Sequence, residues 1–225
     1  MRTLLLLALF LLGIGHGPLA AAETYELLFR SAALKGLEGV PGGGEASQST
    51  LVYNRVISGA DEGRADGSFS IGLKIQPDDN VALTLYQGTR SRGLGNYPVS
   101  VGNPVIMYFL ESVLADVALQ SGGSPFYMRN RIKEALLRDA QVVPVSLDYQ
   151  NRDIAAREVT IRPFTNDKAR ERMGRFSELA LAVTVSEDIP GWYYSLVATV
   201  PAAAGGAEVG YSNAITLKAA GEGRP

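Results

Sequence analysis

Apolar and polar residues alternate with a period of two along most of this chain. The clearest case is residues 69–75, where every second residue from Phe69 to Ile75 is apolar and would share one face of a strand. Strands with one apolar and one polar face suit antiparallel sheets, because parallel strands are usually covered on both faces. We therefore expect about nine antiparallel strands, at residues 25–30, 51–57, 69–75, 81–86, 141–149, 157–164, 178–185, 192–200 and 214–218.

Residues 104–138 interrupt this alternation and predict a helical hairpin. Asn103 suits an N-cap and Pro104 suits a first helical turn, and residues 105–119 are apolar at nearly every position. A helix this apolar must be buried on most sides, which places it inside the curve of a sheet. Two glycines and a serine–proline pair then separate it from a second helix, and a third, short helix is expected at residues 167–173. The predicted fold class is α+β, a curved, half-barrel-like antiparallel sheet packed on an inserted helical hairpin.

The first 22 residues have the layout of a secretory signal peptide. Arg2 precedes an apolar core of about a dozen residues, followed by three alanines that suit a cleavage site. The apolar core is too short and too interrupted by glycine to span a membrane. We expect cleavage after Ala22, one α+β domain at residues 23–220, a disordered tail at residues 221–225, and a location in the periplasm.

The domain that remains would contain neither cysteine nor histidine. The chain has no cysteine, and its one histidine, His16, lies in the expected signal peptide. Disulfide bonds, cysteine nucleophiles, histidine relays and metal sites built from these residues are therefore excluded. We expect no enzyme activity, no cofactor and no metal, although acid–base chemistry by carboxylates stays open. The best carboxylates, Glu111 and Asp116, would lie about 140° apart around one helix and make a poor pair.

Charge argues against nucleic acid as a partner. The chain carries 21 basic and 23 acidic residues, a formal net charge of −2, whereas nucleic-acid-binding domains are usually basic. Basic residues cluster in the stretch GGSPFYMRNRIKEAL at 122–136 and again in residues 162–175. If both clusters met on one rim they would form a basic mouth for lipid headgroups or anionic polymers. A capped amphipathic helix with solvated basic residues explains the first cluster more simply.

Aromatic and basic residues of the hairpin and of the strand near residue 192 form the expected ligand site. If the hairpin sits in the concave side of the sheet, its aromatic residues could line a cavity for an acyl chain. They could equally belong to a filled core, because packing normally fills such spaces. The expected ligand-binding residues are Phe109, Phe126, Tyr127, Arg129, Arg131, Trp192 and Tyr194.

The segment NPVIMYFLE at residues 103–111, followed by GGSPFYMRNRI at residues 122–132, resembles uncharacterised exported proteins of proteobacteria. The order of elements is similar to that of the periplasmic lipoprotein-carrier half-barrels. Their curved antiparallel sheet is closed by helices over an apolar cavity. Those carriers usually place a helix near the N-terminus, where this chain is expected to form the strand at residues 25–30.

These observations favour a non-enzymatic periplasmic protein that binds an apolar or amphipathic ligand, or an envelope component. A structural or assembly factor with a filled core, acting through its surface, is the alternative, and a carboxylate-based hydrolase comes third. The expected partners are a lipid or acyl ligand or an envelope protein, with no nucleic acid. After cleavage of the signal peptide no membrane-spanning segment is expected.

Cleavage after Ala22 can be tested by the mass of the exported protein. We expect export to yield a chain that begins at Glu23, shortened by 22 residues from the full 24.0 kDa chain. Intact-mass spectrometry of protein recovered from the periplasm measures this directly. Recovery of the full-length mass would contradict the assignment.

Overall fold

The computed structural model describes residues 18–37, 49–59, 67–202 and 210–218. The expected tail, and the expected signal peptide up to residue 17, lie outside these described residues.

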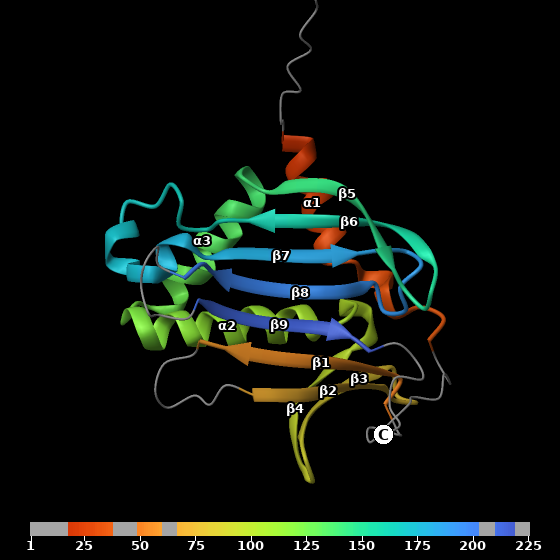
Figure 1. The fold of residues 1–225 in the computed structure, drawn as a ribbon. Coiled ribbons are helices and arrows are strands. Elements are labelled where there is room, and N and C mark those ends of the chain that lie inside the picture. The colour runs from red at the N-terminus through yellow and green to blue at the C-terminus, as the bar shows by residue number, and fades with distance from the viewer. Residues whose placement is uncertain (1–17, 38–48, 60–66, 203–209, 219–225) are drawn as a thin grey trace, which may run out of the picture.

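The described strands form one antiparallel sheet of nine strands (Figure 1). Its order is β4-β3-β2-β1-β9-β8-β7-β6-β5, so the last strand lies in the centre and pairs with the first. The sheet is open and curved, and the predicted α+β, half-barrel-like fold class is confirmed. The strands are β1 Leu51–Ser58, β2 Gly67–Ile75, β3 Asn80–Gln87, β4 Arg90–Pro98, β5 Gln141–Asp148, β6 Asp153–Ile161, β7 Ala180–Val185, β8 Tyr193–Val200 and β9 Tyr211–Leu217.

The predicted helical hairpin is also confirmed, and it covers one face of the sheet (Figure 1). It consists of α2 (Val105–Ser121) and α3 (Pro125–Arg138). The Asn103 side-chain oxygen accepts a hydrogen bond from the Val105 amide at 3.1 Å, and so supports the start of α2 as expected. The remaining helical elements are α1 Pro18–Leu28 and the 3-10 turns η1 Ser31–Leu34, η2 Val99–Val101 and η3 Arg170–Glu178. Among the described residues no helix is long and apolar enough to cross a membrane.

The core lies between the sheet and α2. Across neighbouring strands the register places Tyr53 beside Ile71, and both side chains are fully buried. Phe109 and Val113 of α2 are equally buried, as the apolar sequence of this helix predicts. Each such side chain contributes about 1.5 to 3 kcal/mol when it leaves water, so this layer dominates the stability of the fold.

Two strand assignments differ from the sequence prediction. Residues 25–30, expected as a strand, belong to α1 and its continuation, because Thr24, Leu27 and Leu28 are buried with the spacing of a helix face. Strand β4 is absent from the prediction, because most of its residues are polar or glycine and exposed, so no apolar alternation marks it. The short helix expected at residues 167–173 is the 3-10 turn η3, which begins three residues later. The chain therefore has a helix near its N-terminus after all.

The end of α1 and the residues that follow it are held to the domain through their backbone. The Trp192 indole N–H donates to the Leu27 carbonyl at 2.8 Å, and the Tyr193 hydroxyl donates to the Leu28 carbonyl. Gly102 then passes so close to Arg30 that a Cβ at this glycine would lie 2.2 Å from the Arg30 carbonyl oxygen. The N-terminal segment is thus an integral part of the packed structure.

Gly102 and Gly88 offer a matched test of this close approach. Both have positive φ, 81° and 54°, but a Cβ at Gly88 would meet nothing within 4 Å. We expect Gly88→Ala to lower the free energy of unfolding by about 1 to 2 kcal/mol, the cost of the left-handed conformation. Gly102→Ala should lower it by about 3 to 5 kcal/mol, because the Arg30 backbone must also shift. Urea unfolding measures both, and equal losses would contradict the close packing of this segment.

Candidate functional site

The structure places the seven predicted site residues in three separate regions. Phe109 lies in the interior, on α2. Trp192 and Tyr194 lie where β8 begins, and Tyr194 makes an edge-to-face contact with Tyr149. The other four lie on α3, namely Phe126, Tyr127, Arg129 and Arg131. The seven therefore do not line one common cavity.

Phe109 lines a small apolar slot between the helices and strands β6 and β7. The slot has a volume of about 20 Å³, which admits a single water molecule at most. All of its lining side chains are apolar, and they include Leu28, Phe29, Ile106, Phe109, Val159 and Leu181. We call this space the apolar slot.

Trp192 lines a larger, open cleft beside α1 and η1. Its volume is about 530 Å³, within the range of small-molecule sites. The charged side chains in its wall are Arg30, Arg157, Glu23 and Glu26, two of each sign. We call this space the polar cleft.

Phe29 lies in the wall of both spaces, so the apolar slot and the polar cleft adjoin at this residue. Leu28 lines only the slot and Leu27 lines only the cleft. Neighbouring residues of this segment therefore face different spaces. Phe29 itself is partly buried and packs against Tyr25, with ring centroids 4.7 Å apart. An apolar space and a charged space thus share one aromatic wall.

The backbone of Trp192 is strained where it enters the polar cleft. Its φ is +78°, an uncommon value for a bulky residue, and the Tyr193 amide donates to the Gly191 carbonyl across it at 3.0 Å. The indole hydrogen bond to Leu27 and the Asn103 amide, which donates to the Gly191 carbonyl at 2.8 Å, hold this turn in place. Strained backbone of this kind is concentrated at functional sites.

Arg30 stacks over the Trp192 ring, and both residues line the polar cleft. The guanidinium carbon lies 4.3 Å from the ring centroid, and the same group contacts Glu187 at 3.0 Å. A cation over an indole face is attracted by the ring quadrupole. Arg30 is therefore held at the cleft in a defined position, while Arg157 reaches the same cleft from β6.

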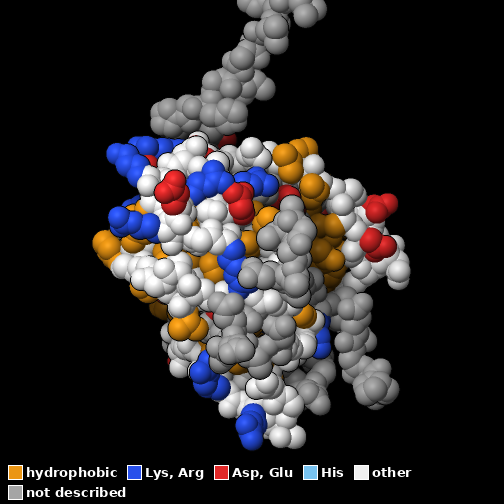
Figure 2. All heavy atoms as spheres, turned by 60° about the vertical axis from the view of Figure 1, so that its left-hand side comes forward, with side chains coloured by type: hydrophobic (Ala, Val, Ile, Leu, Met, Phe, Trp, Pro, Cys, Tyr) orange, Lys and Arg blue, Asp and Glu red, His pale blue; other side chains and the backbone are white. Residues whose placement is uncertain are grey.

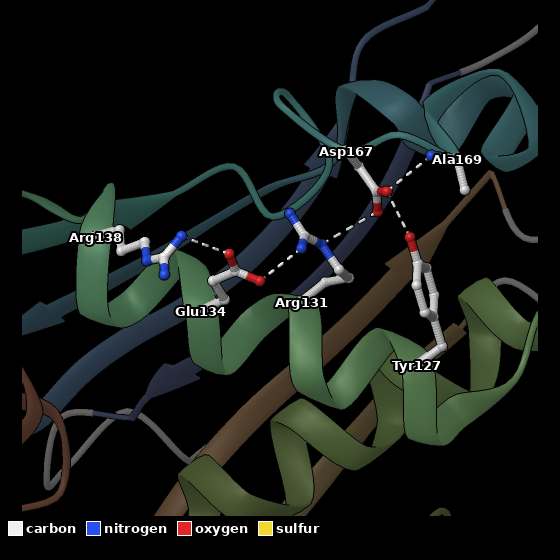
Figure 3. Close-up of polar contacts among 6 residues, drawn as sticks. All are labelled: Tyr127, Arg131, Glu134, Arg138, Asp167 and Ala169. Carbon is white, nitrogen blue, oxygen red and sulfur yellow. Dashed lines mark hydrogen bonds and ion pairs between the residues drawn. The ribbon is translucent and has the colours of Figure 1, made fainter.

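On α3, Tyr127 and Arg131 meet at Asp167, which comes from the connection before η3 (Figure 3). The Tyr127 hydroxyl donates to Asp167 Oδ1 at 2.5 Å, and Arg131 Nε lies 3.2 Å from Asp167 Oδ2. The Ala169 amide donates to the same Oδ1 at 2.8 Å. Burial, and then the hydrogen bond to Asp167, raise the pKa of the Tyr127 hydroxyl. These contacts hold the connection between β6 and η3 against α3 of the hairpin.

The two basic clusters therefore come together on one side of the molecule, but acidic residues lie between them. Figure 2 shows Lys and Arg side chains gathered across this side with Asp and Glu side chains among them. Arg131 also pairs with Glu134 at 2.6 Å, and Arg170 pairs with Glu178. Ser124 makes no side-chain cap at the start of α3. The arrangement fits the expected amphipathic helix better than an anion cradle at its N-terminus.

Glu111 and Asp116 point in different directions, as their spacing predicts. Glu111 lies at the surface and forms an ion pair with Arg129 at 2.9 Å. Asp116 is buried and accepts a hydrogen bond from the Tyr211 hydroxyl at 2.7 Å. The two carboxylates do not converge in a cleft. Within the described ranges no group of three His, Cys, Asp or Glu side chains could hold a metal ion.

Sequence reasoning missed the polar network to which Asp116 belongs. Buried Arg55 of β1 donates to the Tyr108 hydroxyl at 2.8 Å and to Asn213 Oδ1 at 3.2 Å. The Asn213 amide donates to Ser112 Oγ at 3.2 Å, so β1 and β9 are both tied to α2. The signal is present in the sequence, because Arg55 and Asn213 occupy inward positions of alternating strands, where an apolar residue is expected.

Comparison with known proteins gives no family for this chain. No family model matches, and no curated protein sequence matches. Among solved structures, the chain is faintly similar to the lipoprotein LppX of Mycobacterium tuberculosis, with 8% sequence identity. The match covers 93% of this chain and 99% of that one at a TM-score of 0.32. A TM-score this low carries no argument about function.

The Asp167 cluster allows a test of whether a buried ion pair contributes more to stability than an exposed one. The Asp167 side chain is 2% exposed, whereas Glu111 and Arg129 are both about half exposed. Asp167→Asn keeps an acceptor for Tyr127 and Ala169 but loses the ion pair with Arg131. We expect it to lower the free energy of unfolding by about 1 to 3 kcal/mol.

The matched control is Glu111→Gln, which removes a solvent-exposed pair on the same hairpin and should cost less than about 1 kcal/mol. Chemical denaturation measures both variants. A larger loss from Glu111→Gln than from Asp167→Asn would refute the assignment.

Proposed function

We propose that this protein is an exported, single-domain, non-enzymatic binding protein for an amphipathic ligand. The polar end of the ligand occupies the polar cleft, and its acyl chain enters the apolar slot past Phe29. The observation that carries this proposal is the position of Phe29 in the wall of both spaces. Of the residues expected from sequence to bind ligand, Phe109 and Trp192 belong to this site.

The slot must widen to admit a chain. At about 20 Å³ it holds no acyl chain as it stands, so Phe29 and the neighbouring part of α1 must shift outward. Each methylene that leaves water contributes about 0.8 kcal/mol, so a chain of eight to ten methylenes supplies about 6 to 8 kcal/mol. That is comparable with the cost of displacing two or three buried apolar side chains from their contacts.

The polar cleft suits a ligand end that carries both signs of charge. Arg157 and Arg30 can contact an anionic group, and Glu23 and Glu26 can contact a cationic group. Because side chains of both signs line the cleft, it favours a zwitterionic end over a simple anion or cation. Trp192 also lies in the wall of this cleft, beneath the Arg30 guanidinium.

Trp192 is the one tryptophan of the chain, so its fluorescence reports directly on the cleft. We expect dodecylphosphocholine, added below its micelle concentration, to change this fluorescence in a saturable way. Dodecanoate and dodecyltrimethylammonium should bind more weakly, because each matches only half of the cleft charges. Phe29→Ala should strengthen binding of the zwitterion by about threefold or more, because the passage to the slot is opened.

Two variants complete the test. Arg157→Gln should weaken binding of the zwitterion about fivefold, since one charge-assisted contact is lost. Val101→Ser, an exposed apolar position in η2 that lines neither space, serves as the control and should leave binding unchanged. The proposal fails if no saturable change occurs, or if Phe29→Ala and Arg157→Gln bind like the control.

A second candidate is an assembly factor that acts through its surface, and the small volume of the apolar slot favours it. Native mass spectrometry of the protein purified from its own cells, followed by lipid extraction, separates the two. A co-purifying acyl species supports the ligand-binding protein. A clean mass together with a stoichiometric complex with an envelope protein supports the assembly factor.

A further inference from the structure

Two large apolar side chains stand exposed on either side of the turn between α2 and α3. Leu119, near the end of α2, is 70% exposed, and Phe126, near the start of α3, is 69% exposed. Single exposed apolar residues are ordinary on protein surfaces. These two differ because they flank one short turn, residues 122–124, and so project from the same tip of the hairpin.

Further exposed apolar side chains lie along the solvent-facing sides of α2 and α3. On α2 the exposed residues recur every four positions and are mostly apolar, namely Met107, Glu111, Ala115 and Leu119. The solvent face of α3 carries Phe126, Arg129, Lys133 and Leu137, apolar at its ends and basic between them. We call Leu119, the turn, this face of α3 and the adjoining η3 segment the hairpin-tip face. Its combination of exposed apolar and basic side chains is the composition of elements that lie in a membrane interface.

The charge of this region differs in sign from that of the whole chain. Residues 125–139 and 162–178 together contain nine basic and five acidic residues, a balance of +4, although the chain as a whole has −2. The ion pair of Asp167 with Arg131 and its hydrogen bond with Tyr127 hold both segments on one side of the molecule, where Figure 2 shows Lys and Arg side chains gathered. Lys133, Lys168 and Arg172 are exposed there.

We infer that the hairpin-tip face binds the surface of an anionic lipid bilayer. Phe126 and Leu119 enter the headgroup region, and the lysines and arginines around them contact anionic headgroups. A second copy of this chain fits less well, because two copies of this region, whose segments carry more basic than acidic residues, would repel. Leu119 and Phe126 line neither the apolar slot nor the polar cleft, so this inference stands independently of the proposed ligand site.

The absence of cysteine from the chain permits a specific probe. Ser124→Cys, at the exposed turn, can be labelled with an environment-sensitive fluorophore. Labelled protein is titrated with vesicles of phosphatidylcholine alone, and with vesicles containing equal parts of phosphatidylglycerol. We expect saturable binding to the anionic vesicles at 0.1 M salt, and at least tenfold weaker binding to the neutral ones. Binding should also weaken strongly at 1 M salt, where the Debye length falls from about 10 Å to about 3 Å.

Variants separate the apolar from the electrostatic contribution. The pair Leu119→Ser and Phe126→Ser should weaken vesicle binding about tenfold or more, because both inserted side chains are lost. The pair Lys133→Gln and Lys168→Gln should weaken it about fivefold or more and reduce its salt dependence. Val101→Ser, which removes an exposed apolar side chain of η2, is the matched control and should change binding less than twofold.

Three results would overturn the inference. Wild-type protein that does not bind anionic vesicles at 0.1 M salt would refute it, as would serine variants that bind like the control. Sedimentation that shows a dimer abolished by Phe126→Ser, with vesicle binding unchanged, would assign the face to a second copy of the chain instead. Circular dichroism of each variant confirms that its fold is retained before binding is compared.

Discussion

Burial of one face of the sheet by α2 is the constraint on which the other features of this structure depend. An open antiparallel sheet with an apolar face must cover that face, and here α2, 17 residues and about 25 Å long, does so together with α1 and α3. The apolar side chains of α2 dominate the core. The hydrogen-bond network of Arg55, Asn213 and Asp116 fixes the orientation of α2 against the sheet. A buried polar network of this kind restricts α2 to the position in which all of its hydrogen bonds form.

The sequence predicts the parts of this fold that follow from local periodicity. Strict alternation in residues 69–75 identifies a strand, and the apolar run after Asn103 identifies a buried helix, each from its own residues alone. The same reasoning misassigns residues 25–30, because a stretch containing Leu27, Leu28 and Phe29 fits both a strand and a helix period. Strand β4 escapes prediction for the opposite reason, since an exposed edge strand needs no apolar face.

The candidate site is predictable only in part. Phe109 and Trp192 stand out in the sequence as aromatic candidates, but their separation into a slot and a cleft depends on how α1 packs, which local sequence does not specify. Phe29, the residue that links the two spaces, lies in the segment whose secondary structure the sequence predicts wrongly. The positive φ of Trp192 is likewise set by tertiary contacts, through Leu27 and Asn103, that are distant in the chain.

The central position of β9 has a consequence for how the chain folds. Its neighbours in the sheet are β1, which begins about 160 residues earlier in the chain, and β8, so the two halves of the sheet join only through the last strand. Contacts this far apart in sequence form slowly, because a long loop must close first. The two halves of the sheet therefore stay unjoined until β9, at residues 211–217, has been synthesised.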